Sequence, residues 1–175
     1  MAGLSIEKAL KIKDVETLIE QEPFENDFVR IRNSNPVHLI GVPNSCEQIR
    51  VMVDAGWKST CRAGIGWVTL STTGSGFYEY GKAIVAESAT QAEAIAIKDV
   101  ILWAVSSGYW HLEISSDCLP LICHLAGIER AHHLASGILD DIHSLSASFH
   151  CLSFSYISRS CNMYAHSLAE KAMNS

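Results

Sequence analysis

The 175-residue sequence lacks the features of several common classes of protein. Its six cysteines form no Cys-x-x-Cys pair, which argues against a zinc ribbon and favours reduced, packed thiols. The N-terminus has no basic segment followed by an apolar core, and Ala2 does not fit the myristoylation pattern. No apolar run is long enough to span a bilayer. We therefore expect a soluble intracellular protein, in the nucleus or the cytoplasm.

Positive charge is scarce as well. The chain has 13 lysines and arginines against 19 aspartates and glutamates, so its net charge is −6 at pH 7. A polyanion is not attracted to such a chain as a whole, and contacts with nucleic acid would depend on local basic residues or on metal ions. The composition, 48% hydrophobic and 18% charged, supports a packed core in one domain.

The chain divides near residue 47. Residues 1–47 are predicted to be an N-terminal appendage and linker, with a helix over 5–21 and proline breaks at 35–36 and 43–45. Residues 48–175 form the predicted main domain. Strands are predicted at 49–57, 63–71, 77–85, 111–117 and 151–159, and helices at 87–109, 118–127, 132–149 and 162–174. The order βββαβααβα predicts an α/β protein with a five-stranded mixed sheet and helices on both faces. We expect it to be a monomer.

Two aspartates end apolar strands of this order. Asp54 ends the run VMVD, and Asp117 follows the strand HLEISS. If these strands are parallel neighbours, both carboxylates lie at the C-terminal edge of the sheet, where ligand sites gather. Close carboxylates raise each other's pKa, and a divalent cation such as Mg²⁺ removes that penalty. Glu93, at the start of the following helix, is the candidate third ligand.

Each of these acids also has a purely structural interpretation. Asp54 and Asp117 are common types of turn residue at strand ends, and Thr90 and Glu93 have the spacing of a capping box. The case for a site is that the three acids occur together in a βββαβ order.

Five short motifs then follow one another along the chain: VMVDAGW, AGIGWV, QAEAIAI, ISSD and SRSCNMYAHSLAEKA. The ordered set, over residues 48–174, resembles the ribonuclease H fold, and more narrowly the plant ribonuclease-H-like domains related to the tail of retrotransposon reverse transcriptases. The resemblance implies that Asp54, Glu93 and Asp117 are catalytic and bind two metal ions, Mg²⁺ or Mn²⁺. The implied activity is endonucleolytic cleavage of the RNA strand of an RNA–DNA hybrid.

The sequence departs from this family at two catalytic positions. The loop SRSCN, before the last helix, does not contain the mobile histidine that the family has there. Bacterial-type enzymes have a fourth acid on the last helix, in an Asn-x-x-x-Asp setting, but here Asn162 is followed by His166. Imidazole is a poor ligand for Mg²⁺. Three interpretations of His166 stay open: a residue at the solvent edge of the helix, a catalytic proton carrier beside the metal, and a lost catalytic function.

The chain also has few residues with which to hold a nucleic acid. Between residues 118 and 158, where cellular enzymes of this type often carry a basic protrusion, Arg130 is the only lysine or arginine. Hybrid binding is predicted to use Lys58, Arg62, Arg159 and Asn162, with backbone donors near the glycines. We expect weak affinity and steep salt dependence.

These observations leave more than one function open. The leading interpretation is a metal-dependent RNA–DNA hybrid endonuclease, fully active or of reduced activity. The alternative is a non-catalytic, retroelement-derived nucleic-acid-binding module, and a third is an interaction domain in which the acids are structural. A melting temperature that rises with Mg²⁺ or Mn²⁺ is expected for the first two and not for the third.

Overall fold

The computed structural model describes residues 29–31, 48–70, 78–127 and 135–175. The helix expected over 5–21 and the turn expected at 72–76 lie outside these ranges, as do the proline breaks of the linker.

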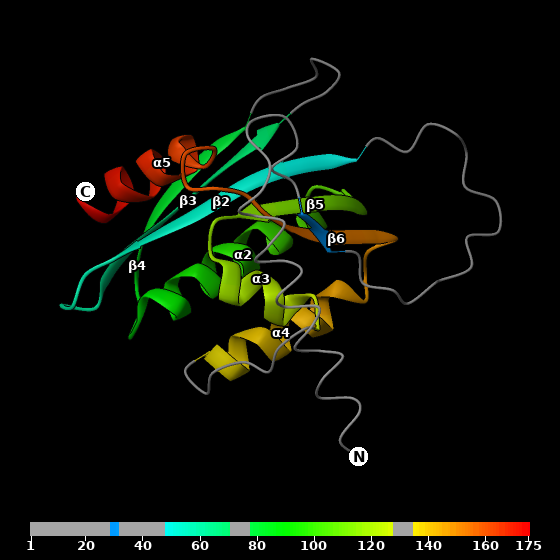
Figure 1. The fold of residues 1–175 in the computed structure, drawn as a ribbon, viewed down its shortest axis with the longest axis horizontal. Coiled ribbons are helices and arrows are strands. Elements are labelled where there is room, and N and C mark those ends of the chain that lie inside the picture. Colours follow the sequence, from blue (N-terminus) through cyan, green and yellow to red (C-terminus); the bar gives the residue numbers. More distant parts are fainter. Residues whose placement is uncertain (1–28, 32–47, 71–77, 128–134) are drawn as a thin grey trace.

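The described strands form one mixed sheet in the order β1-β6-β5-β2-β3-β4 (Figure 1). The strands are β1 (Val29–Ile31), β2 (Ile49–Trp57), β3 (Arg62–Leu70), β4 (Glu79–Val85), β5 (His111–Ser116) and β6 (Cys151–Tyr156). β2, β3 and β4 are antiparallel, whereas β5 runs parallel to both β2 and β6. The predicted five-stranded mixed sheet is confirmed, and β1 adds an edge strand antiparallel to β6.

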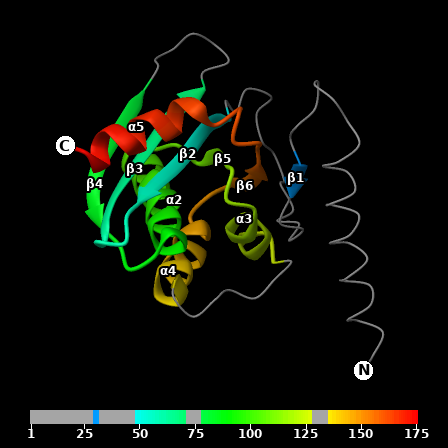
Figure 2. The ribbon, with the colours of Figure 1, turned by 60° about the vertical axis from the view of Figure 1, so that its left-hand side comes forward.

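Helices cover both faces of the sheet (Figures 1 and 2). α5 (Met163–Met173) packs on β2, β3 and β4 from one side, and α2 (Ala89–Ser106) packs on β2 and β3 from the other. α4 (Ser136–Ser146) packs on α2, and α3 (Leu119–Leu125) contacts β6 and α2. From β2 onward the element order is the predicted βββαβααβα.

The side chains of β2 alternate between the two faces of the sheet, so neighbouring residues contact different helices. Val51 and Val53 are fully buried in the core that includes α2. Strand geometry turns their neighbours to the opposite face, where α5 lies. Asp54 is one of these neighbours and is only 1% exposed. A carboxylate therefore lies beneath a helix, which is costly unless it meets hydrogen-bond donors or a cation.

Glycines on β3 allow α5 to approach the sheet closely. A Cβ added at Gly66 would lie 2.4 Å from the backbone nitrogen of Ala169 and 2.5 Å from the carbonyl oxygen of Ala165. A Cβ at Gly64 would lie 2.3 Å from the carbonyl oxygen of Ala169. No side chain fits at these distances, so the helix packs on bare backbone. This close approach brings the first turns of α5 within reach of β2.

The start of α2 shows whether Thr90 and Glu93 form a capping box. Ser88 is the N-cap, and its hydroxyl accepts the backbone N–H of Gln91 at 3.1 Å. Since Ser88 rather than Thr90 caps the helix, Glu93 is not the acid of a capping box. Its side chain turns inward instead, and its Oε2 is buried.

Two further observations concern the class of protein. The described cysteines are all free thiols: Cys61, Cys118, Cys123, Cys151 and Cys161. Among the helices within the described ranges, none is long and apolar enough to cross a membrane.

The boundary near residue 47 stays a prediction. The described part of the N-terminal segment pairs with the main sheet only through the short register from Val29↔Tyr156 to Ile31↔Phe154. A chain that begins at Ser45 should therefore fold with a nearly unchanged melting temperature, measured by circular dichroism beside the full chain. Loss of cooperative unfolding on this truncation would show that the N-terminal segment is integral to the domain.

Candidate active site

The parallel register of β2 and β5 brings two aspartates to the same edge of the sheet. The two strands pair as far as Met52↔Ser115, and β5 ends one residue later. Asp54 and Asp117 are each two residues beyond that last pair, at the point where the strands separate. Their side chains are 2% and 8% exposed. The expected meeting of the two strand ends is therefore present in the fold.

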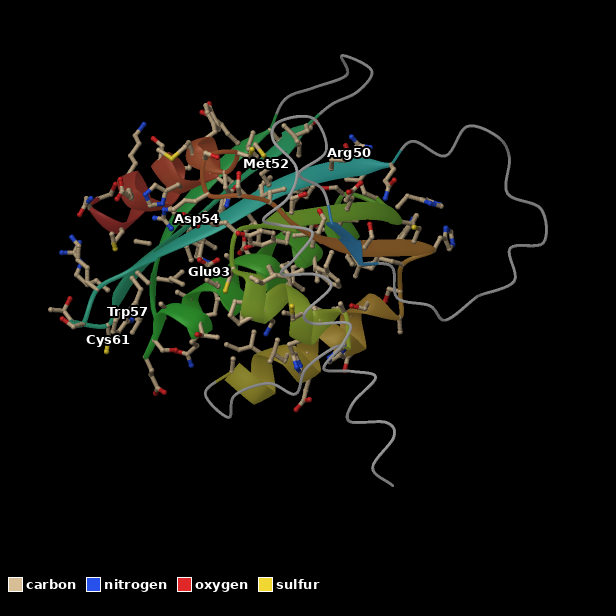
Figure 3. All side chains as sticks on the ribbon, viewed as in Figure 1. Arg50, Met52, Asp54, Trp57, Cys61 and Glu93 are labelled. Atoms are coloured by element: carbon tan, nitrogen blue, oxygen red, sulfur yellow. The ribbon has the colours of Figure 1, made fainter. Side chains whose placement is uncertain are left out.

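Glu93 reaches the same place from α2 (Figure 3). Its carboxylate accepts the backbone N–H of Ala55, the residue after Asp54. The other oxygen, Oε2, is buried and has no hydrogen-bond partner in the part of the chain that the structure describes. Burial, with the nearby charges of Asp54 and Asp117, raises the pKa of Glu93 to about 9.

Asp54 is also perturbed, although less. The pKa of Asp54 is raised to about 6, chiefly by burial and also by the neighbouring Asp117, while a hydrogen bond with His166 acts in the opposite direction. Three carboxylates thus influence one another in a poorly solvated place. Such a cluster is stabilised either by protons or by a cation.

Because ionisation of the buried Glu93 is unfavourable, we expect Glu93→Gln to stabilise the protein in a pH-dependent way. The folded-state pKa of about 9 exceeds the ordinary value of 4.5, so the folded protein holds a proton that the unfolded chain releases between these values. Stability of the metal-free wild type therefore falls as pH rises through this window. We expect Glu93→Gln to be more stable than wild type by about 1–3 kcal/mol at pH 8, and equal to it near pH 4.

Urea unfolding in a metal chelator at both pH values measures this difference. Glu87→Gln is the matched control, because Glu87 is exposed just before the same helix and the substitution removes the same charge there. If wild type and Glu93→Gln differed in free energy of unfolding by the same amount at pH 4 and pH 8, ionisation of Glu93 would not be what destabilises the wild type.

His166 lies inside this centre. Its Nδ1 is 2.7 Å from Asp54 Oδ2, and its Nε2 is 3.4 Å from Glu170 Oε1 one turn later on α5. The side chain is 18% exposed. The structure therefore does not support a merely solvent-edge position, and the proton-carrier and lost-function interpretations remain predictions.

Asn162 supports Asp117 from within the protein. Its amide nitrogen donates to the Val53 carbonyl oxygen at 2.9 Å and to Asp117 Oδ1 at 2.7 Å. The residue is 0% exposed, and its side chain makes no capping hydrogen bond at the start of α5. The expected direct contact of Asn162 with nucleic acid is thus not available in this structure. Its position is that of a support for the site.

The three predicted basic contacts lie at two ends of α5. Arg159, just before the helix, places a guanidinium nitrogen 3.4 Å from Asp117 Oδ2. Lys58 and Arg62 bond to the other end, to the Asn174 side chain at 2.7 Å and the Met173 carbonyl at 3.2 Å. Since an α-helix rises about 1.5 Å per residue, the two ends of the 11-residue α5 are about 15 Å apart.

The donor set fits a hard divalent ion, although the carboxylates are not closed around one. Three carboxylates supply the oxygen ligands that Mg²⁺ and Mn²⁺ prefer, and the unpartnered Glu93 Oε2 is a ready ligand. Over the described ranges, however, no group of three His, Cys, Asp or Glu side chains has the arrangement of a preformed metal site. Convergence of Asp54, Glu93 and Asp117 on one ion therefore stays a prediction.

A cysteine adjoins the centre but is not poised as a nucleophile. Cys118 follows Asp117 directly, and burial together with the charge of Glu93 raises the pKa of its thiol to about 11. The thiolate, which is the reactive form, is scarce at neutral pH.

The mixed sheet, the helices on its two faces and the acids at the ends of β2 and β5 define a ribonuclease H-like α/β domain. The chain belongs to the reverse transcriptase-like family, which it matches over residues 52–172. A comparison with curated proteins finds no match.

Solved structures agree with this fold. The chain is similar to RNase H1 from the archaeon Halobacterium salinarum (TM-score 0.68, 23% identity, 73% of this chain and 98% of that one). It is similar to the N-terminal RNase H domain of a Mycobacterium tuberculosis protein (TM-score 0.67, 21% identity, 73% and 94%). It is also similar to LC11-RNase H1, solved in complex with an RNA/DNA hybrid (TM-score 0.67, 19% identity, 73% and 97%). At these identities the likeness establishes the fold.

Proposed function

We propose that the protein is a divalent-metal-dependent endonuclease that cleaves the RNA strand of RNA–DNA hybrids. The observation that carries the proposal is that buried Glu93 feels the charges of Asp54 and Asp117, while its Oε2 has no partner among the described residues. The family match over residues 52–172 and the fold shared with RNase H1 enzymes support it.

The three carboxylates would hold the metal, and the surrounding residues would hold the carboxylates. A bound divalent ion supplies activation of a water and stabilisation of the leaving 3′ oxygen. Asn162 fixes Asp117 and ties it to β2 through the Val53 carbonyl. His166 orients Asp54 by its hydrogen bond and, in the proton-carrier interpretation, transfers a proton at Nδ1 or Nε2.

The hybrid would lie along α5, which carries basic side chains beside both of its ends. Arg159 is 65% exposed and sits at the mouth of the carboxylate centre, so it is placed to meet a backbone phosphate. Lys58 and Arg62 would contact the backbone at the other end of the helix. With so few cations on an acidic chain, binding is expected to be weak and to decrease steeply with salt.

One observation favours a second function, that of a non-catalytic, retroelement-derived nucleic-acid-binding module. His166 and Arg159 already provide nitrogen partners for Asp54 and Asp117, so part of the acidic charge is met without any metal. A module of this kind would bind hybrids through the same cations and would not cut them.

Cleavage of labelled duplexes separates the two functions. A labelled RNA–DNA hybrid is incubated with the protein and Mg²⁺ or Mn²⁺, beside all-RNA and all-DNA duplexes of the same sequence. The proposal expects cleavage of the hybrid alone. Binding of the hybrid without cleavage in either metal would favour the binding module, and cleavage of all three duplexes would contradict the substrate class.

A further inference from the structure

The two sides of the carboxylate centre differ in what surrounds them. Towards α5, nitrogen atoms already lie against two oxygens: His166 Nδ1 against Asp54 Oδ2 at 2.7 Å, and Arg159 against Asp117 Oδ2 at 3.4 Å. Towards α2, Glu93 Oε2 is buried with no hydrogen-bond partner within the described residues.

Asn162 Oδ1, on the α5 side, is also buried without a partner among the described residues, but it is a neutral amide oxygen whose amide nitrogen is bonded to Asp117. Among the buried carboxylate oxygens that the structure describes, Glu93 Oε2 is therefore the one left open.

His166 closes the α5 side through its hydrogen bond. An ionised carboxylate only accepts hydrogen bonds, so the proton between Asp54 and His166 is on Nδ1. A protonated ring nitrogen has no lone pair with which to bind a metal. An ion approaching Asp54 Oδ2 would have to displace the imidazole, which α5 holds in place and which is only 18% exposed.

Arg159 adds a full positive charge on the same side. A guanidinium nitrogen lies 3.4 Å from Nδ1 and 3.3 Å from Nε2 of His166, while another pairs with Asp117. A guanidinium does not lose its proton in proteins, so it repels any divalent ion placed beside it. The same guanidinium can donate hydrogen bonds to a phosphate oxygen.

We infer that the centre binds a single divalent ion, on its Glu93 side, and that His166 occupies the position that a second ion would require. This inference rests on the proposed metal centre and changes the count of two ions that the family resemblance implies. It assigns to His166 the role of a positioning residue that sets metal stoichiometry.

Metal stoichiometry can be measured on the full chain without any nucleic acid. Mn²⁺ is titrated into metal-free protein, and bound ion is counted by calorimetry and by the electron paramagnetic resonance signal of the free ion. The variants are His166→Asp, which offers an oxygen ligand, and Glu93→Gln, which removes the open one. His143→Asp is the control, because His143 is exposed on α4 and the substitution adds the same charge there. Circular dichroism verifies that each variant is folded.

The expected counts are one ion for wild type and His143→Asp, two for His166→Asp, and none for Glu93→Gln. Two ions bound by wild type would overturn the inference and leave the proposed function standing. A single ion bound by a folded His166→Asp variant would also overturn it, because the histidine would then not be what limits the count. Absence of any bound ion in wild type would overturn the metal centre, and with it the proposed function.

Discussion

Asp54→Asn should reduce hybrid cleavage to background, a loss of at least about 10²–10³-fold, while the protein stays folded. The substitution removes one negative charge at nearly constant shape, so the loss falls on metal binding. The amide oxygen of asparagine can still accept the hydrogen bond that His166 Nδ1 now donates to Asp54 Oδ2 at 2.7 Å. Because a buried carboxylate is replaced by a neutral group, we expect an unchanged or higher melting temperature in the absence of metal.

Initial rates of hybrid cleavage with saturating Mn²⁺, together with thermal unfolding, measure both effects. Asp140→Asn serves as the control, since Asp140 is exposed on α4 and its substitution removes the same charge elsewhere. Cleavage by Asp54→Asn at the wild-type rate would exclude the carboxylate centre as the active site.

His166→Asp should increase Mg²⁺-supported cleavage. The aspartate would supply an oxygen ligand beside Asp54 where an imidazole nitrogen now donates a hydrogen bond. The gain is expected in the rate at saturating substrate, because the change acts on the metal rather than on contacts with the nucleic acid. Rates with Mg²⁺ and with Mn²⁺, compared between wild type and variant, measure it.

A decrease in cleavage by His166→Asp would instead indicate that His166 carries a proton. If His166 carries the proton of the leaving oxygen, its replacement should cost about 10²–10⁴-fold, the usual contribution of general acid–base catalysis. His166→Asn separates the two cases further, because it keeps a hydrogen-bond donor to Asp54 and supplies neither a carboxylate ligand nor a titratable group. A loss of activity in both variants would identify a proton carrier and contradict the missing-ligand account.

Much of the fold could be predicted because the hydrophobic pattern is regular. Alternation in β2 and the long apolar helix after β4 predict the observed element order, although the cap of that helix is Ser88 and not the Thr90 of the capping-box spacing. The edge strand Val29–Ile31 lies within the segment predicted to be an appendage and linker, although the alternating residues around it are a weak strand signal. A three-residue strand forms only when it pairs with a neighbouring strand, here β6, and the local sequence does not predict which strand that is.

The candidate site was predictable only as a set of residues at strand ends. That Asp54 and Asp117 meet follows from parallel neighbouring strands, which the element order favours. The contact of His166 with Asp54 joins residues 112 positions apart, and it depends on how closely α5 approaches β3. Gly64 and Gly66 are the signal for that approach, because their spacing leaves one face of β3 bare.

The support given by Asn162 was missed for a similar reason. Asparagine before a helix usually indicates a cap, and only the packed structure shows its amide bonded to Val53 and Asp117. The residue type alone does not separate a helix cap from a residue that holds a site carboxylate. The burial of the polar side chain at the helix start does.

Strand-specific cleavage of a hybrid tests the central claim most directly. The RNA and DNA strands are labelled separately, and wild-type protein is added with Mg²⁺, with Mn²⁺ or with a chelator. The account predicts that only the RNA strand is cut, only when a divalent ion is present, and that the new RNA ends carry a 3′ hydroxyl. Cleavage that continues in the chelator, or cuts in the DNA strand, would contradict a metal-dependent centre that acts on the RNA of a hybrid.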